Sequence, residues 1–200
     1  MSEQLELAEW RRVIAETYTA ARGAPDPVAG WHLWREQRAR LFREHPQSPL
    51  PPEQRDSDHL PRYFEYDPAW RVLGVVEDAT PMSIALPGSG EETFAATRFG
   101  VVRGAAAGYE LTLGVFWLSG YAGGLFVSFR DAGGGSETYG AGRYLLDTAK
   151  GADLGADGER VVLDFNFAYQ PSCSYDPRWS CPVAPRDNWL DFPVRAGERL

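Results

Sequence analysis

The stretch TFAATRFGVV (residues 93–102), followed shortly by YELTLGVFW (residues 109–117), decides the fold class. Both segments are rich in β-branched and aromatic residues, which favour strands. Similar segments occur at 70–77, 81–86, 125–129, 143–147 and 160–167, and a last short strand is expected at 192–195. Gly-rich turns, such as Gly88-Ser-Gly90 and Gly133-Gly-Gly135, lie between them. Short strands without helices between them predict a mainly β (α+β) fold built on an antiparallel β-sandwich or barrel.

Two helices are expected before the strands and packed on them. The first has Ser2 as a candidate N-cap and ends near Arg22-Gly23. The second begins with Asp26 as the N-cap and Pro27 at the first helical position, and it stops by His45 because Pro46 follows. The apolar stripe of the first helix consists of Leu5, Ala8, Trp10, Val13 and Ile14.

The chain is expected to form a single domain over residues 1–200, since 200 residues suit one hydrophobic core. Residues 1–45 are the helical N-terminal segment, 46–62 a Pro-rich loop and 63–200 the β domain. A loop of this length is either a linker to the β domain, which is the favoured interpretation, or a lid or binding loop.

The composition excludes several classes of function. The net charge is −8 and the chain has 20 basic residues, of which Lys150 is the sole lysine. Without a basic stripe, neither nucleic acid nor an acidic membrane surface is an expected partner. The N-terminus has no apolar run typical of a secretory signal, so a cytoplasmic location is expected. A small-molecule ligand fits these properties, no cofactor is indicated, and the oligomeric state stays open.

The segment LDFNFAY (residues 163–169) carries the first candidate site. Alternation along a strand would place Leu163, Phe165 and Phe167 on a core face. Asp164 and Asn166 would then share the opposite face, as a solvated pair or as the polar wall of a pocket. Both residue types are depleted in strands, which favours a specific role.

Arg143 is the candidate partner of this pair. An arginine fork holds a carboxylate through two parallel hydrogen bonds. A contact between Arg143 and Asp164 would be either a structural clasp or part of a binding site. Gly140 and Gly142, just before Arg143, would let the backbone pass close to another strand or a ligand.

Cys173 and Cys181 are the remaining chemical candidates. Seven residues separate them, which is too many for a zinc knuckle, and two cysteines give no disulfide framework. The favoured interpretation is a close thiol pair that packs or oxidises. A metal site completed by His45 or His59, and a catalytic thiol, are the alternatives, and no metal ligand is assigned.

These residues resemble an uncharacterised family, domain of unknown function 1684 (DUF1684). The motifs that carry the resemblance are TYGAGRYL (138–145), LDFNFAY (163–169) with Pro171 and Cys173, Cys181-Pro182 with Pro185 and Asn188, and Ala196-Gly-Glu198. The resemblance implies that both cysteines, Arg143, Asp164, Asn166, Tyr169 and Asn188 belong to one pattern. Gln170 departs from it, because the family usually has Asn there. The resemblance implies no activity.

The leading hypothesis is a small-molecule-binding domain, or an enzyme of unknown reaction, with a pocket around Arg143 and Asp164. Arg143 would hold an anionic group and Asp164 would be the candidate base. The candidate ligand-binding residues are Tyr139, Asn166, Tyr169, Cys173, Cys181 and Asn188. The rival hypotheses are a structural or protein-interaction module, whose polar residues tie the loop 173–188 to the sheet, and a metal site at the two cysteines.

Overall fold

The computed structural model describes residues 2–121 and 123–200, and it opens with a helical hairpin. Helix α1 spans Glu3–Arg22 and helix α2 spans Pro27–Glu44. As predicted, the Asp26 carboxylate caps α2, accepting a 2.8 Å hydrogen bond from the Ala29 amide. Ser2 occupies the N-cap position of α1, but its side chain makes no capping bond. Neither helix in the described part of the chain has the length and apolar character of a membrane span.

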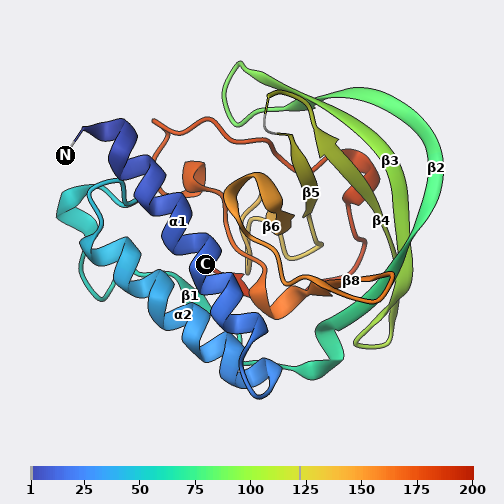
Figure 1. Cartoon of the computed structure of the whole chain (residues 1–200), viewed down its shortest axis with the longest axis horizontal. Coiled ribbons are helices and arrows are strands. Elements are labelled where there is room, and N and C mark those ends of the chain that lie inside the picture. Colours follow the sequence, from blue (N-terminus) through green and yellow to red (C-terminus); the bar gives the residue numbers. More distant parts are fainter. Residues whose placement is uncertain (1, 122) are drawn as a thin grey trace.

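Most of the strands form one curled antiparallel sheet that resembles half of a barrel (Figure 1). In the described residues it has seven strands in the order β6-β5-β4-β3-β2-β8-β7. Their bounds are β2 Arg71–Pro87, β3 Thr93–Ala106, β4 Tyr109–Leu118, β5 Gly124–Phe129, β6 Arg143–Asp147, β7 Ala156–Asp157 and β8 Arg160–Asp164. The mainly β, α+β fold with two N-terminal helices is therefore confirmed, and the sheet adopts an open, barrel-like form.

Three strand predictions need correction. The segments 70–77 and 81–86 belong to one strand, β2, because a register shift between Asp78 and Met82 accommodates the intervening residues. Strand β8 ends at Asp164, where the carboxylate caps a 3-10 turn over Phe165–Phe167. The segment 192–195 is not a strand. Instead β9 (Glu198–Arg199) pairs with β1 (Arg62–Tyr63), which carries the C-terminus back towards the helices.

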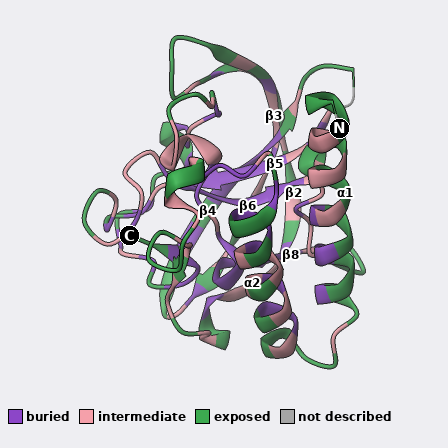
Figure 2. Cartoon of the chain, turned by 90° about the vertical axis from the view of Figure 1, so that its left-hand side faces the viewer, coloured by how far each residue is buried: buried purple, intermediate pink, exposed green. Residues whose placement is uncertain are grey.

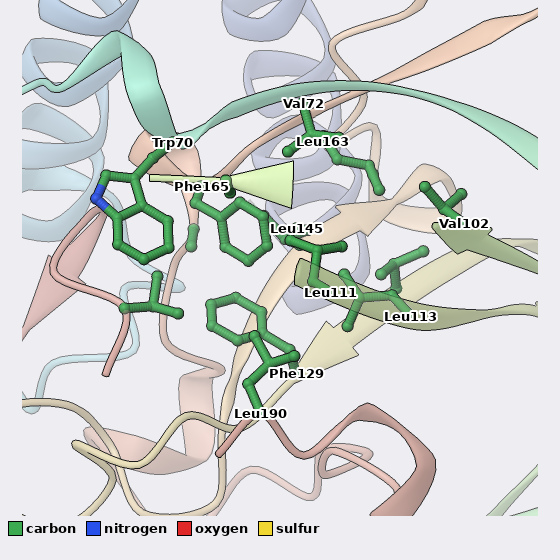
Figure 3. Close-up of a cluster of buried hydrophobic side chains, with 14 of the residues drawn as sticks. Trp70, Val72, Val102, Leu111, Leu113, Phe129, Leu145, Leu163, Phe165 and Leu190 are labelled. Carbon is green, nitrogen blue, oxygen red and sulfur yellow. The ribbon is translucent and has the colours of Figure 1, made fainter. Parts of the chain in front are cut away.

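The main core lies inside the curl of the sheet. Figure 3 shows apolar side chains from β2, β3, β4, β5, β6 and β8 meeting there, with Leu190 from the C-terminal segment. A second, aromatic cluster joins the helices to the 3-10 turn after β8, and it includes Tyr18, Trp31, Trp34 and Phe167. The helices bury their inner faces and expose their outer ones (Figure 2). Leu5 is 59% exposed, so the buried stripe of α1 starts later than the sequence predicts.

The first part of the Pro-rich loop is packed on the protein. The Ser48 hydroxyl donates to the Phe42 carbonyl at 2.6 Å, and Leu50 is buried. The Arg178 guanidinium also donates to the Ser48 carbonyl at 2.8 Å. This part of the loop therefore joins α2 to the C-terminal half.

Candidate functional site

Arg143 lies in the interior as a clasp for the C-terminal segment, and its partner is not Asp164. Its side chain is 0% exposed, and its Nη2 donates to Asp131 Oδ2 at 2.9 Å. The guanidinium also donates to the carbonyls of Val194, Ala196 and Glu198. Sequence alone could not identify Asp131, which lies 12 residues away across a Gly-rich turn. The structural alternative for Arg143 therefore agrees with this geometry.

Gly142 explains how the backbone reaches this position. Its φ is +100°, and a Cβ there would lie 2.5 Å from the Phe129 carbonyl oxygen. The close approach expected of the glycine pair is thus made by Gly142 to a neighbouring strand. Gly140 has no such neighbour, since the nearest atoms to a Cβ there are 3.7 Å away.

Asn188 and Asn166 both hold backbone with their side chains. The Asn188 carboxamide accepts from the Gly114 amide at 2.6 Å and donates to the carbonyls of Gly114 and Ser128. Asn166 bonds the amide and the carbonyl of Asp67 at 3.0 and 2.9 Å. Each carboxamide therefore replaces a strand partner for a segment that lacks one.

Asp164 lies at the wall of a cavity rather than on a solvated strand face. Its Oδ1 accepts from the amide and the Nδ2 of Asn166, at 3.0 and 2.8 Å, and its Oδ2 accepts from the Tyr66 hydroxyl at 3.0 Å. The nearest cation is Arg71, whose Nε lies 3.7 Å from Oδ2. The alternation prediction is wrong here because the chain turns at Asp164, so Asp164 and Asn166 are both buried.

This cavity, the Asp164 cavity, has a volume of about 340 Å³ and lies between the α1–α2 turn and strands β2, β7 and β8. Its apolar wall includes Leu154, Val162 and Phe167, and its charged lining consists of Arg22, Asp26, Arg71, Asp157 and Asp164. The lining thus offers both apolar surface and charged groups to a small molecule.

Burial raises the pKa of Asp164 above its ordinary value of 3.8, and the hydrogen bonds from Asn166 and Tyr66 oppose the shift. Burial and the Asp164 charge also raise the pKa of Tyr66. Asp164 therefore takes up a proton more readily than an exposed aspartate, which suits a group that exchanges a proton with a ligand.

Tyr169 belongs to a different part of the interior. With Tyr18, Arg38 and Tyr144 it lines a small cavity of about 50 Å³ beneath α1. The Arg38 guanidinium lies 5.0 Å from the Tyr169 ring centre and donates to Glu198 Oε2 at 2.8 Å. This ion pair ties α2 to β9, so Tyr169 packs against a structural bridge.

The other sequence candidates form a thiol cluster. Cys173 and Cys181 are free thiols that lie close enough to shift each other's pKa. The Tyr139 hydroxyl lies 3.9 Å from Cys173 Sγ, and Ser89 also lies close enough to lower the pKa of Cys173. The predicted site residues thus divide between the Asp164 cavity, the small cavity at Tyr169, the thiol cluster and the side chains that hydrogen-bond to backbone. In the described chain, no three His, Cys, Asp or Glu side chains gather closely enough to hold a metal ion.

Sequence reasoning missed Arg71, Tyr66 and Ser89. Arg71 begins β2 opposite Asp164, since the two residues are register partners of β2 and β8. The pairing of those two strands would have identified it, but strands so far apart in the chain give no local signal. Tyr66 contacts Asp164 across a separation of 98 residues, so no local signal could identify it either.

The fold and these motifs define a class of protein without an assigned activity. Residues 59–199 match the model of the family described as protein of unknown function (DUF1684). The chain belongs to this family. It is similar to an uncharacterised protein of Haloarcula marismortui whose structure was solved in solution by NMR, with 38% identity and a TM-score of 0.61. The match covers 83% of this chain and 90% of the other. No curated protein matches significantly.

Asp147, at the end of β6, supplies a prediction on pH dependence. It is 2% exposed, its Oδ1 has no hydrogen-bond partner, and its Oδ2 lies 3.8 Å from Lys150 Nζ. Burial raises its pKa above 3.8. A raised pKa in the folded state means that stability present below the unfolded pKa is lost as the pH rises through the folded pKa. Asp147→Asn is expected to gain stability relative to the wild type over the pH range above 3.8, the ordinary pKa of an aspartate.

Thermal denaturation of both proteins across this pH range tests the prediction. Lys150→Gln is the matched control, because it removes the favourable charge near Asp147 and should increase the loss of stability with pH. A constant difference between Asp147→Asn and wild type at all pH values would contradict the assignment.

Proposed function

We propose that the protein binds a small molecule with an anionic group in the Asp164 cavity. The main support for the proposal is the guanidinium group of Arg71. Its side chain is 31% exposed, and its contact with Asp164, at 3.7 Å, is longer than a hydrogen bond. Within residues 2–121 and 123–200 no shorter polar contact occupies this guanidinium, so its fork is open to a carboxylate or phosphate group.

The rest of the lining supports the same ligand class. Leu154, Val162 and Phe167 offer apolar surface for the body of the molecule. Arg22 is used elsewhere, since it donates to the Asp153 carbonyl and the Thr19 hydroxyl. Asp26 is used as the cap of α2. Arg71 therefore takes the anchoring role that the sequence suggested for Arg143.

Asp164 would face the bound molecule beside this anchor. Its carboxylate is held by Tyr66 and Asn166, so its position is fixed before a ligand arrives. In this arrangement Asp164 serves as a hydrogen-bond partner for the ligand, and an enzymatic reaction would use it as the base.

Binding is tested by NMR titration of the purified protein with benzoate, citrate and glycerol 3-phosphate. Arg71→Gln is expected to weaken the tightest of these at least about tenfold, as a charge-assisted hydrogen bond contributes about 1.5–3 kcal/mol. The matched control is Arg103→Gln on β3, an arginine whose side chain is 60% exposed and pairs with Glu77. This control should bind as the wild type does.

Two outcomes would contradict the proposal: no saturable shift at residues of the Asp164 cavity, or equal affinity in Arg71→Gln and wild type. Comparing the native mass of the freshly purified protein with its denatured mass would also reveal a retained ligand. A mass excess that disappears in Arg71→Gln supports the site.

A structural or protein-interaction role is the second candidate. It is supported by three buried polar side chains that hydrogen-bond to backbone groups, namely those of Arg143, Asn166 and Asn188. This role predicts that Arg71→Gln leaves binding unchanged and costs only a little stability, because Asp164 loses its nearest cation. Asp164→Ala would destabilise the protein more, because Asn166 and Tyr66 lose their acceptor.

A further inference from the structure

We propose that Cys173 and Cys181 form a dithiol site at which Cys173 is oxidised by a hydroperoxide and Cys181 then closes a disulfide. This inference is independent of the Asp164 cavity, whose lining includes neither cysteine. The two cysteine side chains belong neither to the proposed ligand site nor to the side chains that hydrogen-bond to backbone.

The two thiols lie in segments that the fold brings together. Cys173 lies in the short 3-10 turn Ser172–Ser174, and Cys181 lies beside the end of β2. Two backbone contacts hold Cys181 there: its carbonyl accepts from the Ser89 amide at 2.9 Å, and its amide donates to the Ser89 hydroxyl at 3.1 Å. Each thiol lies close enough to shift the pKa of the other.

Cys173 and Cys181 differ in their exposure to solvent. Cys173 is partly exposed, whereas Cys181 is 3% exposed. Ser89, whose hydroxyl accepts from the Cys181 amide, is exposed. A small hydroperoxide from solvent thus reaches Cys173 more readily than it reaches Cys181.

Three neighbouring side chains lower the pKa of Cys173 below its ordinary value of 9.0. Cys181 has the largest effect, followed by Ser89 and by Tyr139, whose hydroxyl lies 3.9 Å from Cys173 Sγ. The Cys173 side chain in turn raises the pKa of Cys181. The charged group that acts on Cys181 is Lys150, and the tyrosines near the pair are Tyr139 and Tyr144. In this proposal Cys173 is the thiolate that attacks the hydroperoxide, and Cys181 is the protonated thiol that attacks the oxidised Cys173 afterwards.

The chemistry has two steps. The Cys173 thiolate attacks the terminal oxygen of a hydroperoxide ROOH; the S–O bond forms, the O–O bond breaks, and RO⁻ takes up a proton to leave as ROH. Cys181 then attacks the sulfur of the Cys173 sulfenic acid, its proton leaves with the hydroxyl as water, and the S–S bond forms. In total, two thiols and one ROOH give one disulfide, ROH and water.

The full-length, reduced protein is titrated with hydrogen peroxide, and its denatured mass is measured. The wild type is expected to lose two hydrogen atoms per chain. Cys181→Ser should instead gain one oxygen atom and react with dimedone, because the sulfenic acid has no partner. Cys173→Ser should oxidise more than about tenfold more slowly, since the remaining thiol is buried and protonated.

Tyr139 is assigned as a positioning residue. In Tyr139→Phe the alkylation rate of Cys173 by iodoacetamide should reach half of its maximum at a higher pH than in the wild type. Tyr121→Phe, at an exposed residue, is the matched control and should leave the profile unchanged. If Tyr139 had only a structural role, the pH profile of Cys173 alkylation would be the same in Tyr139→Phe as in the wild type.

A measurement on the wild type keeps the proposal testable if a cysteine variant does not fold. Peptide mapping after brief treatment with iodoacetamide should find Cys173 labelled and Cys181 protected. The proposal is overturned if Cys181 is labelled first. It is also overturned if peroxide adds oxygen to the wild type without removing two hydrogens, or if Cys173→Ser oxidises as fast as the wild type.

Discussion

Arg143→Ala is expected to lower the free energy of unfolding by about 3–5 kcal/mol, because it leaves a buried charge without its partner. Asp131 Oδ2 would keep one hydrogen bond, from the Thr138 hydroxyl at 3.0 Å. The carbonyls of Val194 and Glu198 would lose donors that now lie 2.9 Å away. Residues 194–198 would lose their hydrogen bonds from Arg143 in β6.

Urea denaturation followed by tryptophan fluorescence measures this loss. The matched control is Arg103→Ala, which removes an exposed arginine from β3 and should leave the midpoint nearly unchanged. The double variant Arg143→Ala/Asp131→Ala should be less destabilised than the sum of its parts, since no unpaired charge remains. If Arg143→Ala kept the wild-type midpoint and lost ligand binding instead, Arg143 would bind the ligand, and its structural assignment would be wrong.

Asn188→Ala is expected to cost about 2–4 kcal/mol, since three buried backbone groups would lose their partner together. These groups are the Gly114 amide, at 2.6 Å, and the carbonyls of Gly114 and Ser128, at 3.0 and 2.7 Å. Asn188→Asp is expected to be worse, because a carboxylate would face two carbonyl oxygens without a donor between them.

The neighbouring residue supplies the control. Asp187→Ala removes a surface pair with Arg98, in which the aspartate side chain is 45% exposed, and should change the urea midpoint little. Hydrogen exchange at the Gly114 amide offers a local measure, with faster exchange expected in Asn188→Ala. Wild-type protection of this amide in the variant would contradict the assigned bond.

Short-range chemistry made much of the fold predictable. The Asp26 cap and Pro27 set the start of α2, and the run before Pro46 set its end. The Tyr109–Trp117 segment was predicted as a strand and is one, β4, because its β-branched and aromatic residues suit a pleated surface. The turn at Asp164 was not predictable in this way. Leu163, Phe165 and Phe167 alternate as a strand would, yet Asp164 caps a 3-10 turn instead.

The candidate site was predicted in parts. Asp164, Cys173 and Cys181 were chosen as chemically unusual residues, and the structure places them at a cavity and in a thiol pair. Their partners Arg71, Ser89 and Tyr66 were missed. Each of these partners reaches the site across strands or loops that lie far apart in the chain.

The sequence by itself determined the two helices, most of the strands and the residues with chemical potential, because caps, turns and periodicity act over a few neighbouring residues. Only the tertiary structure decided which partner each polar side chain has. Arg143 bonds Asp131 rather than Asp164 because the curl of the sheet and the returning C-terminal segment surround it with one carboxylate and three carbonyls. Such a choice depends on which buried groups lack partners, and that is settled by the packing of the whole chain.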